Sequence, residues 1–176
     1  MLKPQDILVL LKLVVVGNKS WSYNRLAIEL DMSPAEVHAA CKRAVLARLA
    51  YKINNKIIPN KANLEKFIIN GLPFVFYVER GEMVRGIPTA FAADPLNKDI
   101  VADTEPLPVW PYEEGEIRGM SFKPLYKSAP KAAKNDKGLY ELLVLVDAIR
   151  GGRAREKKIA CDRLTEVFKD GWNTEP

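Results

Sequence analysis

The residues best able to do chemistry in this sequence are small and basic side chains on one side of residues 34–48. Val37 and Ala40 recur at helical spacing and predict the buried side of a helix there. At about 100° per residue, the opposite side holds Ala35, Ala39, Lys42 and Arg43, with His38 on the flank. Small residues allow close approach to a surface, while Lys and Arg can bind phosphate oxygens or guanine edges. An ordinary solvated helix face is the alternative interpretation.

Other chemistry finds little support. His38 is the single histidine, and no cysteine or second histidine lies beside it to form a metal site. No G-x-S-x-G nucleophile motif occurs, and Gly151-Gly152 is not followed by the G-K-[ST] of a nucleotide-binding loop. Cys41 and Cys161 lie in helical patterns, as buried free thiols do. We therefore expect no enzyme activity, no cofactor and no metal; an unrecognised catalytic site within residues 74–168 is the alternative.

A clear start signal positions the basic side chains. Ser33 is expected to cap a helix that begins at Pro34, and Glu36 completes the S-x-x-E capping box. A shorter apolar-periodic helix precedes it, and Asp31-Met32 makes the turn between the two.

A two-stranded hairpin is expected directly after this helix. Residues 50–53 and 56–59 predict the strands, and Asn54-Asn55 lies at the tip, where positive φ is tolerated. Lys52 and Lys56 flank the tip, as a hairpin that touches phosphates would require. A plain surface hairpin with solubilising lysines is the alternative.

The run LAIELDMSPAEV, followed by KR and by strand-turn-strand, resembles winged helix-turn-helix DNA-binding domains, particularly bacterial regulators of the MarR type. The likeness covers about residues 1–60. It implies that helix 34–48 enters the major groove and that residues 51–58 form a wing against the DNA backbone. One departure is Asp31-Met32, where the family usually has glycine before the capping serine. The residues expected to contact DNA are Tyr23, Asn24, Ser33, Ala35, His38, Ala39, Lys42, Arg43, Lys52, Asn54, Asn55 and Lys56.

The charge is distributed unevenly along the chain. The formal net charge is +5, and the first 62 residues hold ten of the 27 Lys and Arg but only four of the 22 Asp and Glu. The positive excess therefore lies in the segment with the helix-turn-helix pattern, while the remainder is nearly neutral. A polyanion-binding part joined to a near-neutral part explains this distribution.

The rest of the chain predicts a mixed but mostly helical structure. Residues 61–80 are expected to connect the two parts, with a helix over 61–70 capped by Asn60 and a strand over 74–78. The continuation of a buried segment is the alternative for 74–78. Residues 81–126 are rich in Pro and Gly and predict a small irregular β-containing segment, in which 109–111 and 117–122 form a hairpin. Two helices, 139–149 and 154–168, follow. The expected fold class is α+β, mostly helical, with an N-terminal winged helix-turn-helix.

Two groups of arginines next to glycines are candidate anion sites. Arg85 and Arg118, each followed by Gly, could hold an anion or a partner carboxylate; ordinary salt bridges are the favoured alternative. A possible second anion site consists of Arg150, Arg153 and Arg155 around two glycines before the last helix. A flexible turn and a solvated helix face are the alternative there.

The partners follow from these parts. Residues 1–60 are expected to bind double-stranded DNA, and residues 81–176 to serve dimerisation, partner or effector binding. The first helix, 4–16, is apolar on more than one side, so either a second subunit or residues beyond 60 must cover it. We expect a homodimeric, cytoplasmic, sequence-specific transcriptional regulator with no membrane segment, dimerising through Leu10, Leu11 and Val14 or through Leu142, Leu145 and Val146. The alternative is an antitoxin-like module whose C-terminal half binds a co-expressed protein.

Overall fold

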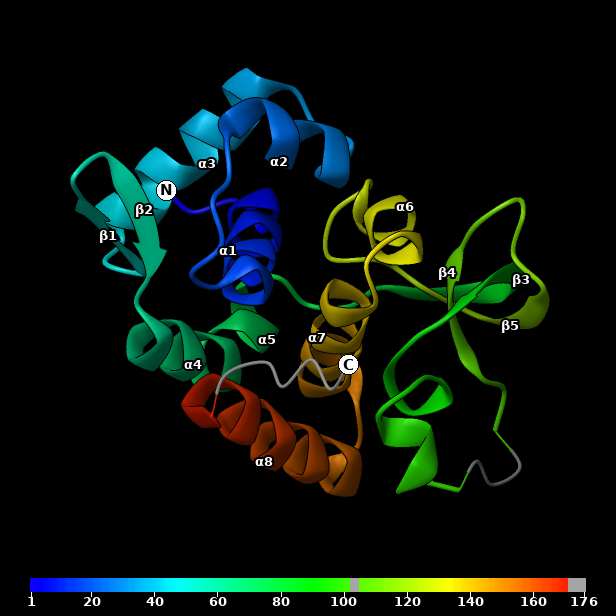
Figure 1. The fold of residues 1–176 in the computed structure, drawn as a ribbon. Coiled ribbons are helices and arrows are strands. Elements are labelled where there is room, and N and C mark those ends of the chain that lie inside the picture. The colour runs from blue at the N-terminus through cyan, green and yellow to red at the C-terminus, as the bar shows by residue number, and fades with distance from the viewer. Residues whose placement is uncertain (102–104, 171–176) are drawn as a thin grey trace.

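The computed structural model describes residues 1–101 and 105–170, and residues 102–104 and 171–176 of the expected C-terminal domain lie outside that description. The fold is α+β and mostly helical (Figure 1). The first elements are α1 (Pro4–Val16), α2 (Tyr23–Leu30), α3 (Pro34–Leu46), β1 (Ala50–Ile53) and β2 (Lys56–Pro59). They are followed by α4 (Lys61–Asn70), α5 (Leu72–Val75), β3 (Arg80–Pro88), two short 3-10 helices (Ala90–Ala92 and Leu96–Lys98), β4 (Pro108–Pro111), β5 (Ile117–Phe122), α6 (Ala129–Lys134), α7 (Lys137–Gly151) and α8 (Ala154–Asp170).

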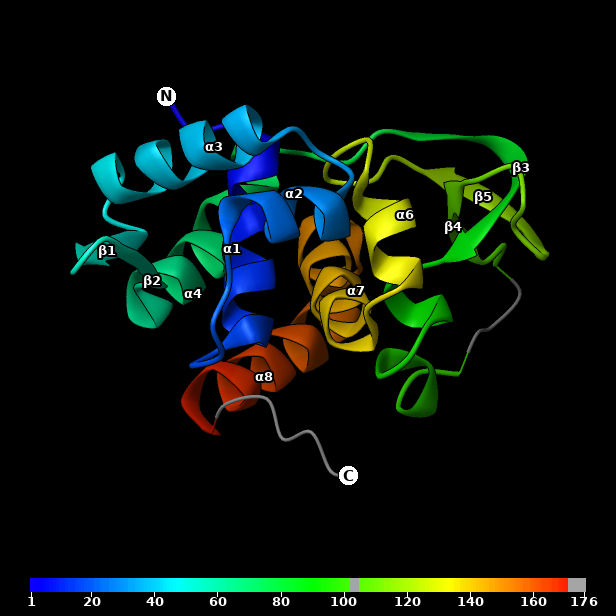
Figure 2. The same cartoon turned by 45° about the horizontal axis from the view of Figure 1, so that its top comes forward.

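Helix α1 is buried on all sides within the one chain. Every residue from Ile7 to Val14 is buried, because α3 packs on one side of the helix and α7 on another (Figures 1 and 2). The apolar sequence of α1 is thus covered by later parts of the chain, and residues 1–60 and 81–170 share one hydrophobic core.

The two apolar surfaces that were expected to form a dimer interface are therefore buried within the chain. Leu11 is 0% exposed, and its neighbours Leu10 and Val14 are buried with it. The same holds for the α7 alternative, Leu142, Leu145 and Val146. The predicted dimer interface is wrong at both places. Helices α1 and α7 are core helices, and these side chains pack inside the chain's own hydrophobic core.

The helices α2 and α3, the turn between them and the β1–β2 hairpin form as the local signals predict. The Ser33 hydroxyl accepts from the Glu36 amide (3.2 Å), and the Ser33 amide donates to the Glu36 carboxylate (2.8 Å), so the capping box is confirmed. Asp31 adopts the left-handed conformation (φ 52°, ψ 49°) that glycine usually supplies, which short polar side chains tolerate. Asn54 and Asn55 both have positive φ (48° and 61°), as a two-residue hairpin turn requires.

The predicted strand over residues 74–78 is wrong. Pro73 lies in the first turn of the short helix α5, where a missing N–H costs little. The chain after α5 runs without a strand partner, because the Arg150 guanidinium takes the carbonyls of Phe76 (2.8 Å) and Tyr77 (3.5 Å). The Arg150 side chain, more than 70 residues further along the chain, thus takes the place of the neighbouring strand that the apolar sequence predicted.

The predicted hairpin of 109–111 with 117–122 is also wrong. Strands β4 and β5 run parallel to each other, and each pairs antiparallel with β3, so the three close into a small barrel. Closure brings backbones together at two glycines. A Cβ on Gly86 would lie 2.0 Å from the Trp110 carbonyl oxygen, and one on Gly119 would lie 2.1 Å from the Leu107 carbonyl oxygen. Glycine at both places permits the close approach of the backbones that the closed barrel requires.

A buried carboxylate holds this barrel against α7. Asp147 accepts hydrogen bonds from the Thr89 hydroxyl (2.7 Å) and the Trp110 indole (2.6 Å), and it pairs with Arg150 (2.7 Å). Burial raises the pKa of Asp147, while Arg150 and the two neutral donors act to lower it. The carboxylate therefore joins α7 to β4, to the end of β3 and, through Arg150, to the chain after α5.

Replacing Asp147 with Asn should destabilise the fold by roughly 3–5 kcal/mol, because Arg150 would be left as a buried charge without its partner. Urea denaturation measures the change. Asp99→Asn is the matched control: it breaks an exposed pair with Arg163 (2.6 Å) and should cost less than about 1 kcal/mol. Equal midpoints for the two variants would contradict an anchoring role for Asp147.

Candidate nucleic-acid interface

The residues expected to contact DNA lie on one edge of the molecule, formed by α2, α3 and the β1–β2 hairpin (Figure 2). On α3, Ala35, His38 and Lys42 are exposed and Ala39 is half-buried. On the hairpin, the exposed residues are Lys52, Asn54, Asn55 and Lys56. Asn24 and Ser33 are exposed and Tyr23 is half-buried. The structure thus brings these eleven residues to one edge, while the twelfth, Arg43, is engaged elsewhere.

Arg43 does not point outward as the helical spacing predicted. Its guanidinium makes two hydrogen bonds to the Asp6 carboxylate, at 2.8 and 2.6 Å, and Asp6 is 0% exposed. The hydrogen bond to Asp6 raises the pKa of Arg43. Asp6 also accepts from the Lys3 amide and so caps α1 (2.9 Å). Arg43 is therefore a structural residue that ties α3 to the start of α1, and the prediction that it reads a base is wrong.

The exposed lysines, in contrast, are available. Within the described residues, Lys42, Lys52 and Lys56 have no ion pair with an acidic side chain. Arg48 adds a fourth exposed cation just after α3; it has φ 59°, and its carbonyl accepts from the Asn63 amide (2.9 Å). The predicted helix ran to residue 48, but α3 ends at Leu46, so helical spacing did not indicate where Arg48 lies.

An aromatic row connects the start of α2 with α3. Trp21 and Tyr23 meet edge to face with ring centroids 5.3 Å apart, and Tyr23 lies 5.2 Å from the His38 ring. Burial raises the pKa of Tyr23, so its hydroxyl stays protonated at neutral pH and can donate a hydrogen bond. The row fixes the position of His38 on the outer side of α3.

The C-terminal half reaches the N-terminal end of α3. The Tyr126 hydroxyl donates to Glu36 (3.2 Å), and Lys131 pairs with Asp31 (2.7 Å). Lys127 lines a shallow groove of about 740 Å³ with Asn24 and Ser33. These contacts offset the negative charge of Asp31 and Glu36 beside the interface. They join residues about 90 to 100 apart in sequence, so no local pattern indicated them.

The predicted second anion site is wrong. Arg150 is buried against Asp147, and Arg153 pairs with Glu105. The Arg153 amide also donates to the Glu156 carboxylate (3.1 Å), which occupies the start of α8. Arg153 and Arg155 are both exposed, but of the three only Arg155 has no ion pair within the described residues, so their side chains do not converge on a common anion.

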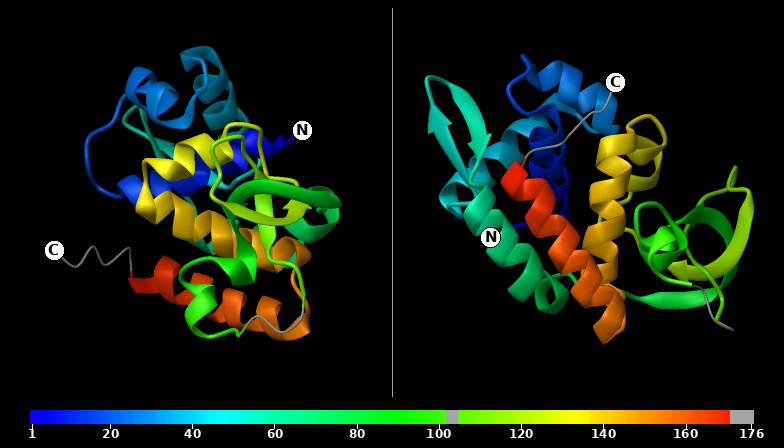
Figure 3. Two further views of the ribbon diagram at one scale, coloured as in Figure 1. Left: turned by 90° about the vertical axis from the view of Figure 1, so that its right-hand side faces the viewer. Right: turned by 60° about the horizontal axis from the view of Figure 1, so that its bottom comes forward.

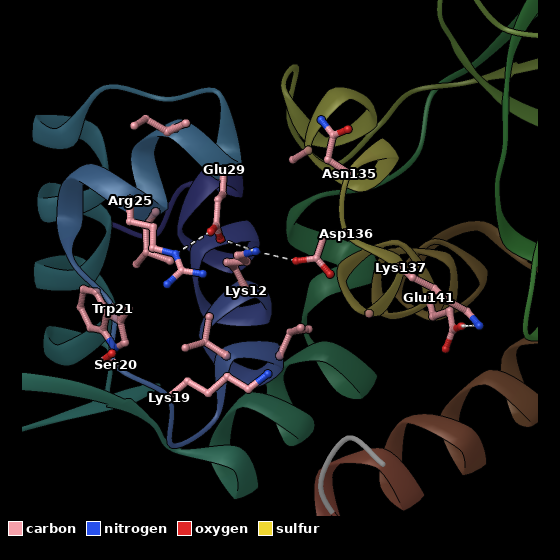
Figure 4. Close-up of a pocket in the computed structure, with 16 residues that line it drawn as sticks. Lys12, Lys19, Ser20, Trp21, Arg25, Glu29, Asn135, Asp136, Lys137 and Glu141 are labelled. Carbon is pink, nitrogen blue, oxygen red and sulfur yellow. Dashed lines mark hydrogen bonds and ion pairs between the residues drawn. The ribbon is translucent and has the colours of Figure 1, made fainter. Parts of the chain in front are cut away.

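A cleft of about 970 Å³ separates α1 and α2 from α6 and the start of α7 (Figure 4). Lys12 lies between Glu29 (2.6 Å) and Asp136 (2.5 Å), and Arg25 also binds Glu29 (2.8 Å). Only 8% of the Lys12 side chain is exposed. Asp136 in turn caps α7 by accepting from the Leu139 amide (3.0 Å). No local pattern indicated this role for Lys12, because its neighbours in α1 are apolar.

The ionisation of these groups follows from their partners. Burial alone would lower the pKa of Lys12, but hydrogen bonds to Asp136 and Glu29 outweigh it and raise that pKa. Burial would raise the pKa of Glu29, but hydrogen bonds from Lys12 and Arg25 lower it. Lys12 and Glu29 are therefore both charged at neutral pH, and the contacts of Lys12 with Glu29 and Asp136 hold α2 against the N-terminus of α7.

Three further observations concern other kinds of site. Among the described residues, no three His, Cys, Asp or Glu side chains are grouped so that they could hold a metal ion. In the same part of the chain, no helix combines the length and the apolar character needed to cross a bilayer. Burial raises the pKa of Cys41 to about 11, so its thiol is not a nucleophile at neutral pH.

Arg43→Ala should lower the free energy of unfolding by at least about 2 kcal/mol, because it leaves the buried Asp6 carboxylate without its cation. Breaking a fully buried ion pair costs roughly 3–5 kcal/mol, and since Arg43 is partly exposed the loss should not exceed that range. Lys42→Ala, one residue away and exposed, is the control and should stay within about 0.5 kcal/mol of the parent. Guanidinium denaturation of both variants measures this. Equal stability of the two would return Arg43 to the list of candidate base readers.

Glu29→Gln should make the free energy of unfolding depend less on pH below neutrality. Because the pKa of Glu29 is lowered in the folded state, its stabilisation is present above its ordinary pKa and is lost as the pH falls through the folded pKa. Unfolding free energies measured between about pH 7 and pH 3 should therefore fall less steeply in the variant than in the parent. Glu166→Gln, on an exposed position of α8, should follow the parent curve. Parallel curves for Glu29→Gln and the parent would contradict the role of the Lys12 network.

Comparison with protein-family models, with curated proteins and with solved structures found no match. The function is therefore inferred from the geometry of the chain itself. The parts that carry this inference are the outer side of α3, the hairpin and their charges.

Proposed function

We propose that this protein is a double-stranded DNA-binding transcriptional regulator of the winged helix-turn-helix type, acting in the cytoplasm. Helix α3 would lie in the major groove, and the β1–β2 hairpin would touch the DNA backbone. The observation that carries the proposal is the shared edge, where exposed Lys42 on α3 and exposed Lys52 and Lys56 on the hairpin stand without acidic partners in the described part of the chain.

The dimensions of α3 support this role. Its 13 residues span about 20 Å, which suits a helix that enters a groove about 12 Å wide. The small side chain of Ala35 at the exposed end allows close approach, while His38 and Lys42 offer donors to base edges or phosphates. Since Arg43 is held by Asp6, base reading rests on Asn24, His38 and Lys42.

The charge distribution supports a largely electrostatic mode of binding. The excess of positive charge lies in the first 62 residues, and the two acids nearest the N-terminus of α3 are bound by Lys131 and Tyr126. Counterion release from DNA then contributes a large part of the affinity. With few base-reading side chains, one copy can specify only a short sequence, so specific binding would use two copies on an inverted repeat with half-sites about one helical turn apart.

A second candidate function is an antitoxin-like interaction with another protein. It is favoured by a run of large apolar side chains exposed at and after α5: Phe74 (79% exposed), Val75 (54%) and Tyr77 (65%). Copurification with a second protein that is lost in Phe74→Glu would support this role. The two functions are compatible within one chain.

Lys52→Ala and Lys56→Ala should each weaken binding to all duplexes alike and reduce the slope of log affinity against log salt by about 0.9. Fluorescence anisotropy of a labelled duplex, titrated at several salt concentrations, measures both quantities. Lys158→Ala is the control, because α8 lies on the side of the molecule away from α3 (Figure 1). No duplex binding by the parent at low salt, or a response to salt that is flat, would contradict the proposal.

Lys42→Ala should instead reduce the preference for one sequence, by about 1–3 kcal/mol for the preferred site if Lys42 binds a guanine edge. A panel of duplexes with single base-pair changes measures the preference. A uniform loss over the whole panel would show that Lys42 contacts phosphate only.

A further inference from the structure

Two pairs of side chains lie directly opposite each other on the outer side of the barrel. In the antiparallel pairing of β3 with β5, Arg85 is opposite Arg118 and Met83 is opposite Met120. Opposite residues project to the same side, with Cβ atoms about 5 Å apart. Both arginines are exposed, Met83 is 44% exposed and Met120 is half-buried. We call these four residues the Arg–Met face. The strands that carry them, β3 and β5, lie at the right of Figure 1 and at the right of the right-hand view in Figure 3.

The arginine pair lacks an acceptor within the described chain. Like charges directly opposite each other destabilise a sheet. The register of β3 with β5 nevertheless holds the two arginines opposite each other, and the pairs on either side of them are Val84 with Gly119 and Gly86 with Ile117. Neither forms an ion pair in the described residues, so the alternative of ordinary salt bridges is not realised there. Six other arginines do have acceptors: Arg25, Arg43, Arg80, Arg150, Arg153 and Arg163.

Acidic side chains without partners lie beside this face. The loop from Tyr112 to Glu116 begins with the Tyr112 amide donating to the Arg85 carbonyl (3.1 Å), and its Gly115 lies against the Gly86 backbone. Glu113 and Glu116 are exposed and form no ion pair within the described residues, whereas Glu114 pairs with Lys134 (3.0 Å). Cations and anions therefore stand next to each other on the barrel without neutralising one another.

We propose that this side of the barrel is an interface on which a second copy of the chain docks about a two-fold axis. In such a dimer each surface meets its own image, so neighbouring patches of opposite sign pair twice. Arg85 and Arg118 of one copy bind Glu113 and Glu116 of the other. Met83 and Met120 form the apolar part of the contact, and Met and Arg are both enriched at protein interfaces.

The charge of the barrel favours a second copy of the chain over a nucleic acid as the binding partner. Residues 80–122 contain four Lys and Arg against eight Asp and Glu, so the barrel as a whole repels a polyanion while its arginine pair attracts a local acid. The exposed apolar residues Phe74, Val75 and Tyr77 lie at and after α5 and do not belong to the barrel strands. The dimer is inferred from the barrel alone and does not depend on DNA binding.

Light scattering on the full chain at micromolar concentration, without DNA, tests the proposal. We expect a mass of twice 19.8 kDa that falls towards the monomer as salt is added. The double variant Arg85→Glu with Arg118→Glu should be monomeric, as should Glu113→Lys with Glu116→Lys, and an equimolar mixture of the two should regain the dimer mass. All four positions are exposed, and circular dichroism checks that each variant is folded.

Location is tested by a further variant. Phe74→Glu with Tyr77→Glu should remain dimeric, because these residues belong to the α5 surface. A monomeric parent, a dimer that persists in both charge-reversed variants, or a dimer lost only in the α5 variant would each overturn the proposal. Failure of the two charge-reversed variants to associate on mixing would overturn the assigned pairing.

Discussion

The buried carboxylate of Asp147 is the constraint on which the C-terminal half depends. A charge removed from water is tolerated only when all its hydrogen-bonding capacity is used, and here the donors come from three separate parts of the chain: Thr89, Trp110 and Arg150. Arg150 also donates a hydrogen bond to the Phe76 carbonyl and so ties the chain after α5 to the same carboxylate. The barrel, α7 and α5 must therefore assemble together, since none of the three satisfies its buried polar groups alone.

Partly buried ion pairs play the same part in the N-terminal half, and they decide which cations remain for function. Arg43 binds Asp6 and fixes α3 to α1, while Lys12 binds Glu29 and Asp136 and fixes α2 to α7. The cations left at the surface are those with no buried carboxylate within reach, such as Lys42. The proposed DNA interface thus consists of exposed residues such as Lys42, on helices that the ion pairs of Arg43 and Lys12 hold in place.

How much could be predicted from the sequence depended on the range of the interactions involved. The Ser33 cap, the Asn54-Asn55 turn and the bounds of α1 and α4 rest on neighbours within four residues, and all were predicted. The helical period also placed Lys42 correctly, but it could not show that Arg43, one residue on, curls back to a carboxylate 37 residues away. The parallel pairing of β4 with β5 was missed for the same reason: short strands carry no sign of direction, and the glycines that permit closure act across the barrel.

Lys12 has a mechanical consequence for the molecule. It is the one cation that lies between Glu29 on α2 and Asp136 at the start of α7 in the described chain, and it is nearly inaccessible to solvent. Without its charge the two carboxylates would face each other across the cleft, and attraction would become repulsion. Of the charged and polar contacts described above, those of Lys131 with Asp31 and of Tyr126 with Glu36 would still join the α2–α3 unit to the C-terminal half. Lys12 thus acts as a charged spacer that keeps two like-charged helix ends together, at a point far from the outer side of α3.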